Sequence, residues 1–423
     1  MLNNIGPFIN RCFNSFSQIR VAKKMKIIRD RYYKHLKFIV FIYILASIVS
    51  YGYTIATGTY NGDFSGYVVS LSPIVLGGML LFSLSPFIYL WSRYSYYKKK
   101  KSKYSVPVHI PFVEGVAIFL IIIRLFLFGI CIQRGGKVSD LGWLLTVLES
   151  ISPVIYIYIY FISSRRKYKI IVILLFLGEA FFKRSLNIVF SVGCLVLFCY
   201  YDQIKSLIKR HVVICFFLIL SFPTIVAQLY ILRGELRGNN SVDFTEKSGS
   251  EVLCDVLAGR LSSYANACFI IEDAVGSYVY AQSLPATFFQ SRICEIYGIH
   301  LVSWPDFKPE KYLHVRYQNG NYEAQDSSTS LMLGIPGILI MSFLKSPWVF
   351  LLNIGTILLI IEVCFQLISP LNVPFANEIP VLLLLYPVLS GVSIELFFVV
   401  MQLIGLRILL YFNNKFTQNT IPI

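Results

Sequence analysis

The sequence predicts an all-α polytopic membrane protein with about ten transmembrane helices and one large, partly helical loop between spans 7 and 8. Of its 423 residues 56% are hydrophobic and only 14% are charged, which is more apolar surface than a soluble fold can bury. Apolar segments near 20 residues recur, and each is long enough for a hydrocarbon core of about 30 Å. Lys and Arg are concentrated in short runs beside these segments, so the net charge of +16 reflects membrane topology rather than nucleic-acid binding.

The first 37 residues form a basic, amphipathic arm directly before the first apolar segment. We expect residues 1–37 to lie on the cytoplasmic membrane surface, with no cleavable signal peptide.

The apolar segments define the predicted spans, with boundaries good to about three residues. They are 38–57, 67–91, 111–131, 142–163, 170–182, 186–201, 212–232, 329–344, 348–369 and 380–410. Region 38–232 therefore holds helices 1–7, and region 326–410 holds helices 8–10. Residues 411–423 follow as a cytoplasmic tail, and the last span is long enough to break in two at Gly391.

The basic residues orient the chain. If the spans alternate, most Lys and Arg fall on one side, which the positive-inside rule makes cytoplasmic. These residues occupy the arm and the connections 92–108, 164–169 and 202–211. The large loop, 233–325, then lies outside, as do the short connections 58–66, 132–141 and 370–379.

Arginines on the outer side run against this topological bias. They are Arg134, Arg184, Arg233, Arg237, Arg260, Arg292 and Arg316, while Arg124 lies within the third span. Guanidinium groups bind phosphate oxygens in bidentate geometry and stay charged when partly buried. Such a cluster at the membrane boundary favours an anionic lipid-linked substrate, such as a diphosphate. The alternative for any one arginine is a solvated or salt-bridged surface charge, or a side chain that snorkels to headgroups.

Two segments of the large loop have helical character. In "SEVLCDVLAGRLSSYANACFIIEDAV", residues 250–275, apolar residues recur at three- and four-residue steps, with Arg260 in the middle. A short helix is expected at 285–298, carrying Arg292 and Glu295. The turn-rich stretch 304–330 is either the lining of a glycan groove or a plain connection. Three acids, Glu179, Glu362 and Glu395, fall within spans, where a carboxylate is costly to place.

Several kinds of chemistry have no sequence support. There is no Walker loop or dinucleotide fingerprint. The outer side has no acid pair suited to a metal, and its only histidines are His300 and His314, so neither a metal site nor a cofactor is expected.

Five segments together resemble the Wzy-type O-antigen (oligosaccharide repeat-unit) polymerases of Gram-negative bacteria. They are "QRGGKVSDLGWL", "FFKRSLN", "LRGELRG", "AGRLSSY" and "SSTSLMLGIPG", and the topology of the whole chain is similar as well. The resemblance implies a metal-independent glycosyltransferase of lipopolysaccharide biosynthesis in the bacterial inner (cytoplasmic) membrane, with its active site facing the periplasm. Such an enzyme transfers the growing glycan from undecaprenyl diphosphate onto the non-reducing end of an incoming lipid-linked repeat unit. The implied partners are the lipid bilayer and the chain-length regulator and flippase of the same pathway.

The resemblance also implies roles for individual residues. The diphosphate would be bound by Arg124, Arg184, Arg233, Arg237, Arg260 and Arg292. Positive charge placed there would stabilise the leaving group. The expected catalytic residues are Glu235, Arg260 and His300, and the expected glycan contacts are Tyr264, Tyr278 and Arg316. The attacking hydroxyl needs a base, for which Glu235, His300, Glu272, Asp273 and Asp306 are available. Glu235 is preferred, although its neighbours Arg233 and Arg237 would lower its basicity.

Three other functions stay open. An O-antigen ligase uses the same donor but another acceptor. A lipid-phosphosugar glycosyltransferase would place an acid in the first outer connection, where Asp63 lies. A repeat-unit flippase would have short loops and two similar halves, and the loop 233–325 argues against it.

Overall fold

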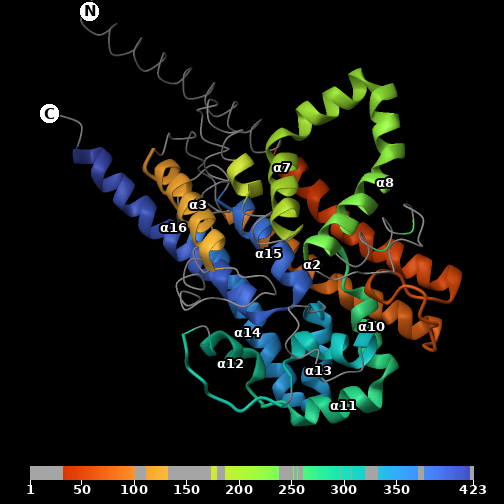
Figure 1. Ribbon diagram of the computed structural model, residues 1–423. Coiled ribbons are helices and arrows are strands. Elements are labelled where there is room, and N and C mark those ends of the chain that lie inside the picture. Colours follow the sequence, from red (N-terminus) through yellow and green to blue (C-terminus); the bar gives the residue numbers. More distant parts are fainter. Residues whose placement is uncertain are drawn as a thin grey trace, which may run out of the picture.

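The computed structural model describes two thirds of the chain, and these residues are folded into helices joined by short turns (Figure 1). The described residues are 32–100, 111–131, 173–178, 186–237, 251, 255, 261–295, 297–305, 307–319, 332–369 and 376–419. Within these ranges there is no strand, only an isolated bridge between Thr59 and Val68.

Four helices in the described ranges are long and apolar enough to cross a membrane. They are Tyr32–Thr57, Pro73–Lys99, Pro347–Ile368 and Ser393–Phe412. The chain is therefore an α-helical membrane protein, as the composition predicted, and the count of about ten spans stays a prediction. The span expected at 142–163 and most of that at 170–182 lie outside the described residues.

Polar contacts near the carboxyl-terminal end of α2 (Pro73–Lys100) join it to the later half of α14 (Pro347–Ile368). At the far end of α2, Arg93 Nη2 lies 2.6 Å from Glu362 Oε2 on α14, and the Tyr97 hydroxyl donates to the same carboxylate. The residues just before both helices lie at the consecutive helices of the large loop that hold Glu272 and Gln282. Ser70 and Leu71 donate to Glu272 before α2 begins, and Gln282 donates to the Leu344 and Lys345 carbonyls before α14 begins. Both helices therefore run in the same direction.

This parallel course corrects one topological prediction. Glu378, near the end of the 370–379 connection, accepts a hydrogen bond of 3.0 Å from Tyr94, so Glu362 before this connection and Glu378 at its end both lie at the Arg93 end of the molecule. Strict alternation had placed 370–379 on the side of 58–66. The difference arises because α13 (Gly334–Lys345) has 12 residues, about 18 Å, and is too short to cross a bilayer alone. The span predicted at 329–344 is therefore a short buried helix that returns the chain to the α12 side.

The last apolar segment breaks at Gly391, where the sequence allowed a split. Gly391 has a left-handed φ of +72° and ends α15 (Glu378–Ser390), and α16 (Ser393–Asn419) follows it. A Cβ added to Gly391 would lie 2.9 Å from Gly334 Cα and closer still to the Gly334 carbonyl. Only glycine combines this backbone conformation with so close an approach of two chains. The α16 helix continues through residues that were predicted as tail.

Three further long elements complete the description. The helix α3 (Pro111–Cys131) packs on α16, as Figure 1 shows. The helices α7 (Leu186–Arg210) and α8 (Val212–Arg237) meet at His211 with a bend of 103° between Val192–Arg210 and Val212–Ile225. The apolar side chains after the bend are exposed, among them Val213 at 68% and Phe217 at 62%, as expected for a surface that meets lipid.

The described part of the large loop is a folded helical unit. It contains α10 (Tyr264–Glu272), α11 (Ala274–Ser283) and α12 (Phe288–Glu295), followed by a 3-10 turn at Pro309–Lys311 and a π-helical turn at His314–Asn319. Short helices were predicted at 250–275 and 285–298; the first is interrupted before α10, and α11 was not anticipated. Residues Tyr264 to Ile270 of α10 are all buried, and α10 packs on α2 and α13. The unit is therefore part of the protein core.

Candidate functional site

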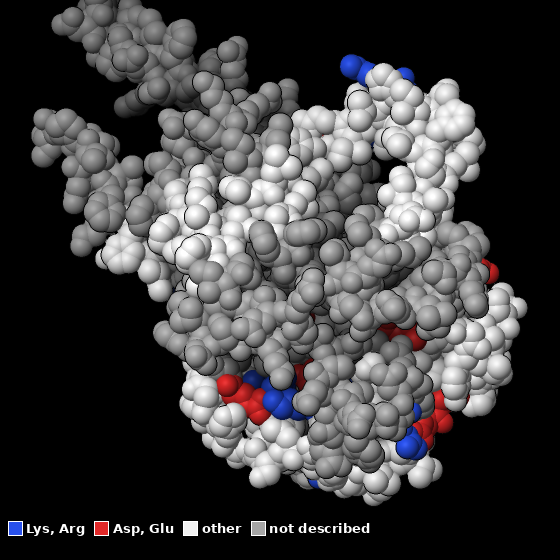
Figure 2. Space-filling model, in the orientation of Figure 1, with Lys and Arg blue, Asp and Glu red and all other residues white. Residues whose placement is uncertain are grey.

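Charged side chains of the described residues gather around the helical unit α10–α12, as Figure 2 shows for one face of the molecule. Elsewhere on this face most described atoms belong to uncharged residues, apart from basic residues at the bend between α7 and α8. The α10–α12 end is therefore the part of the described structure best equipped for polar chemistry.

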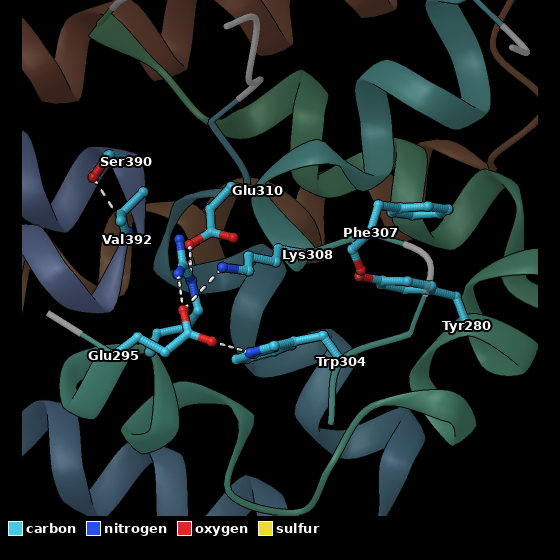
Figure 3. A network of polar contacts seen from close by, with 9 residues as sticks. Tyr280, Glu295, Trp304, Phe307, Lys308, Glu310, Ser390 and Val392 are labelled. Carbon is cyan, nitrogen blue, oxygen red and sulfur yellow. Dashed lines mark hydrogen bonds and ion pairs between the residues drawn. The ribbon is translucent and has the colours of Figure 1, made fainter. Parts of the chain in front are cut away.

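The densest cluster is an ionic network of two cations and two carboxylates (Figure 3). Arg292 and Glu295 are three residues apart on α12, so they share one face and form an ion pair. Arg292 Nε also donates to Glu310 Oε1 at 3.0 Å. Lys308 Nζ donates to Glu295 Oε2 at 2.9 Å, and the Trp304 indole N–H donates to the other oxygen of Glu295. We call Arg292, Glu295, Lys308 and Glu310 the α12 ionic network.

The network is held in a partly dry position. The side chains of Arg292, Glu295 and Glu310 are 17%, 9% and 15% exposed. Burial raises the pKa of Glu295, but donors from Lys308, Trp304 and Arg292 outweigh it, so the pKa lies below its usual value. Glu295 is therefore ionised at neutral pH, and its carboxylate holds its three donors in place.

Local sequence explains how the network forms. Pro309 begins the 3-10 turn that brings Glu310 back toward α12. Beside it, the Tyr280 ring stacks on the Phe307 ring at 4.9 Å, and the Tyr280 hydroxyl donates to the Phe307 carbonyl. The aromatic stack anchors the turn to α11 (Figure 3).

A second polar cluster joins the unit to the connection between the first helix and α2. The Glu272 carboxylate accepts from the Tyr60 hydroxyl, from the backbone N–H groups of Ser70 and Leu71, and from the Ser70 hydroxyl. Asn266 Nδ2 lies 3.2 Å from Asp63 Oδ2 and donates to the Met332 carbonyl at 2.7 Å. These contacts fix the connection between the first helix and α2 against α10.

Two predicted bases are thereby committed to structural roles. Glu272 has donors on both oxygens. Asp273 accepts the Gly276 N–H as the cap of α11 and pairs with Arg316 at 2.8 Å. Asp306 lies outside the described residues, and His300 is exposed on a turn after α12.

The predicted arginines with described side chains lie on three different elements. Arg124 is buried, at 4% exposed, within α3. Arg292 is bound by Glu295 and Glu310, and Arg316 is bound by Asp273, so both have carboxylate partners rather than open guanidinium groups. Arg292 and Arg316 are thus held in separate ion pairs, while the expected arginine cluster as a whole stays a prediction.

The remaining predicted residues fall outside this description. Arg134, Arg184 and Arg260 are among the residues that are not described. Arg233, Glu235 and Arg237 belong to the last turn of α8, where only the backbone is described.

The predicted glycan contacts have different surroundings. Tyr264 is fully buried and meets Tyr51 edge to face, so it belongs to the core and is not open to a glycan in this state. Tyr278 is 52% exposed on α11. Arg316 is exposed beside Asp273.

Sequence reasoning missed Trp304, Lys308 and Glu310. Their signal is present in "WPDFKPEKY", where charges alternate with prolines and aromatics, but without the fold it reads as an ordinary turn. Glu310 is notable because its second oxygen, Oε2, is buried and has no hydrogen-bond partner among the described residues. No group of three metal-ligand side chains occurs in the described ranges.

The chain matches no protein-family model, no curated protein and no solved structure.

Proposed function

We propose that the protein is an O-antigen polymerase, a glycosyltransferase that acts on glycans carried by undecaprenyl diphosphate at the periplasmic side of the inner membrane. One observation carries the proposal: the unit α10–α12 is built into the membrane helices and presents the half-buried α12 ionic network there. Lipid-linked glycan chemistry needs such a place, because the reacting sugar and diphosphate lie just above the membrane surface. A transport protein with short connections has no need of one.

The proposed reaction is a displacement at the anomeric carbon of the donor glycan. The acceptor hydroxyl oxygen forms the new bond, the bond to the diphosphate oxygen breaks, and its electron pair leaves with the diphosphate. A base takes the hydroxyl proton. Arg184, Arg233, Arg237 and Arg260 are the proposed diphosphate ligands, and they would stabilise the charge that develops on the leaving group.

The ion pairs change the role proposed for Arg292 and add Glu310 to the candidate residues. Arg292 is assigned to positioning, because Glu295 and Glu310 already bind it. Glu310 joins Glu235 and His300 as a candidate base. Its Oε1 is fixed by Arg292, while Oε2 has no hydrogen-bond partner among the described residues. Glu310→Asp keeps the carboxylate but shortens the side chain, whereas Glu310→Gln keeps the length and removes the charge. The two variants therefore separate the need for a charge from the need for a side chain of this length.

Deletion of the gene, followed by gel analysis of lipopolysaccharide, tests the function. Loss of the ladder with one capped repeat retained supports a polymerase, whereas loss of every repeat indicates a ligase or a flippase. Complementation with Arg260→Ala should leave single-repeat products, and a normal ladder would remove Arg260 from the site. Glu310→Gln should act like Arg260→Ala if Glu310 is the base. Immunoblots of membranes must show wild-type amounts of each variant.

A further inference from the structure

The outward face of α11 is apolar and uncharged. The helix, "AVGSYVYAQS", contains no charged residue. Its inner face is buried through Ser277, Tyr280 and Ala281. On the opposite face Val275, Tyr278 and Val279 are 79%, 52% and 64% exposed. These three positions follow helical spacing and form one stripe, whereas a helix face that meets water normally carries charged residues.

The end of α11 is fixed to the turn between α13 and α14. Gln282 Nε2 donates to the Leu344 carbonyl at 2.8 Å and to the Lys345 carbonyl at 3.2 Å. In return, Lys345 Nζ donates to the Gln282 carbonyl at 2.5 Å. Figure 1 shows α11 alongside α13 at the edge of this end of the molecule. The stripe thus has a fixed position relative to the start of α14.

Large exposed apolar side chains also flank that turn. Phe343 is 60% exposed and Trp348 is 79% exposed. Farther along α14, Leu351 and Leu359 are 55% and 63% exposed. Because α14 is long and apolar enough to cross a membrane, this exposed side faces lipid.

We propose that α11 is an interfacial helix that rests in the bilayer leaflet beside α10 and α12. Its contact surface is the α11 apolar patch, which we define as Val275, Tyr278, Val279, Phe343 and Trp348. The occupant is lipid because the end of α11 is hydrogen-bonded to the turn that precedes the lipid-facing side of α14, and because the five residues of the patch are uncharged. Tyr and Trp are the aromatic residues enriched at this depth, and an interfacial helix buries its apolar face about 5–10 Å into the headgroup and acyl boundary.

The inference gives the helical unit two attachments. Glu272 joins α10 to the protein, and the α11 apolar patch joins the unit to the membrane. Under this arrangement Tyr278 meets lipid rather than a glycan. The inference does not depend on the proposed enzymatic reaction.

Site-specific photo-crosslinking in lipid vesicles tests the proposal. Benzoylphenylalanine would replace Val279 or Tyr278 in the full chain, reconstituted in phosphatidylethanolamine–phosphatidylglycerol vesicles. Trp348, at the start of α14, is the positive control. Glu251, a charged and exposed residue of the large loop, is the water-facing control. All four positions are exposed, so the probe should be accommodated.

Illumination followed by mass spectrometry should give phospholipid adducts at Val279, Tyr278 and Trp348 and none at Glu251. Adducts at Trp348 without adducts at Val279 and Tyr278 would overturn the proposal. Crosslinks from Val279 to a second copy of the chain, or to another protein, would overturn it as well.

Discussion

Tyr60 and Glu272 lie 212 positions apart in sequence, yet the Tyr60 hydroxyl donates to the Glu272 carboxylate at 3.0 Å. Ser70 and Leu71 donate to the same carboxylate through their backbone N–H groups. One acidic side chain thus closes the connection before α2 and attaches it to the end of α10. The contact joins the amino-terminal helices to the large loop.

Removal of this acid should loosen the attachment. We expect Glu272→Ala to lower the free energy of unfolding by about 2–3 kcal/mol, because several donors lose a charged acceptor. Tyr60→Phe removes one donor only and should cost about 1 kcal/mol. Thermal unfolding in detergent would measure both. Equal effects of the two variants would show that Glu272 is not the shared acceptor.

The sequence predicts the fold class and some of the helices, but it does not predict how the helices pair. Composition and the lengths of apolar segments identify a helical membrane protein, because a single apolar segment can cross lipid only as a helix that satisfies its own backbone hydrogen bonds. The α12 helix lies within the segment 285–298, where a short helix was expected. The α11 helix was missed because "AVGSYVYAQS" has no polar face to mark a period, although Asp273 before it is a suitable cap.

Long-range pairing was beyond sequence reasoning. Glu362 was recognised as costly within a span, but its partner Arg93 could be named only once α2 and α14 lay side by side. Arg292 was expected to bind a diphosphate because the position of an arginine in the sequence does not reveal which carboxylates it will meet in the fold. Glu310 reaches it only through the turn at Pro309.

The lowered pKa of Glu295 predicts how acid affects the α12 ionic network. A carboxylate with a folded-state pKa below its unfolded value of about 4.3 contributes stability above that value and loses it as pH falls through the folded pKa. The wild type should therefore lose stability below about pH 4.3, and Glu295→Gln should lose less over this range while being less stable at pH 7. Unfolding midpoints measured from pH 3 to pH 7 check this. Parallel curves for the two proteins would contradict the assignment.

The parallel course of α2 and α14 predicts a topology that alternation of ten spans does not. A reporter fused after residue 370 should read on the same side as one fused after Lys101, because Glu362 and Glu378 both lie at the Arg93 end. A reporter after residue 240 should read on the opposite side, which the positive-inside rule makes external. Paired phosphatase and fluorescent-protein fusions provide the measurement. A reporter at 370 that agrees with the one at 240 would restore the alternating arrangement.

Gly391 offers the sharpest test of the break between α15 and α16. Gly391→Ala forces a side chain into a left-handed conformation, at about 1–2 kcal/mol. It also drives a Cβ against Gly334, and overpacking of this kind adds about 1–3 kcal/mol.

Gly355→Ala on α14 is the matched control, because an added Cβ there meets nothing within 4 Å. The control should be neutral or stabilising by up to about 1 kcal/mol. Thermal unfolding in detergent should therefore separate the two variants clearly. If Gly391→Ala and Gly355→Ala unfolded at the same temperature, α15 and α16 would have to be joined by a different turn from the one described.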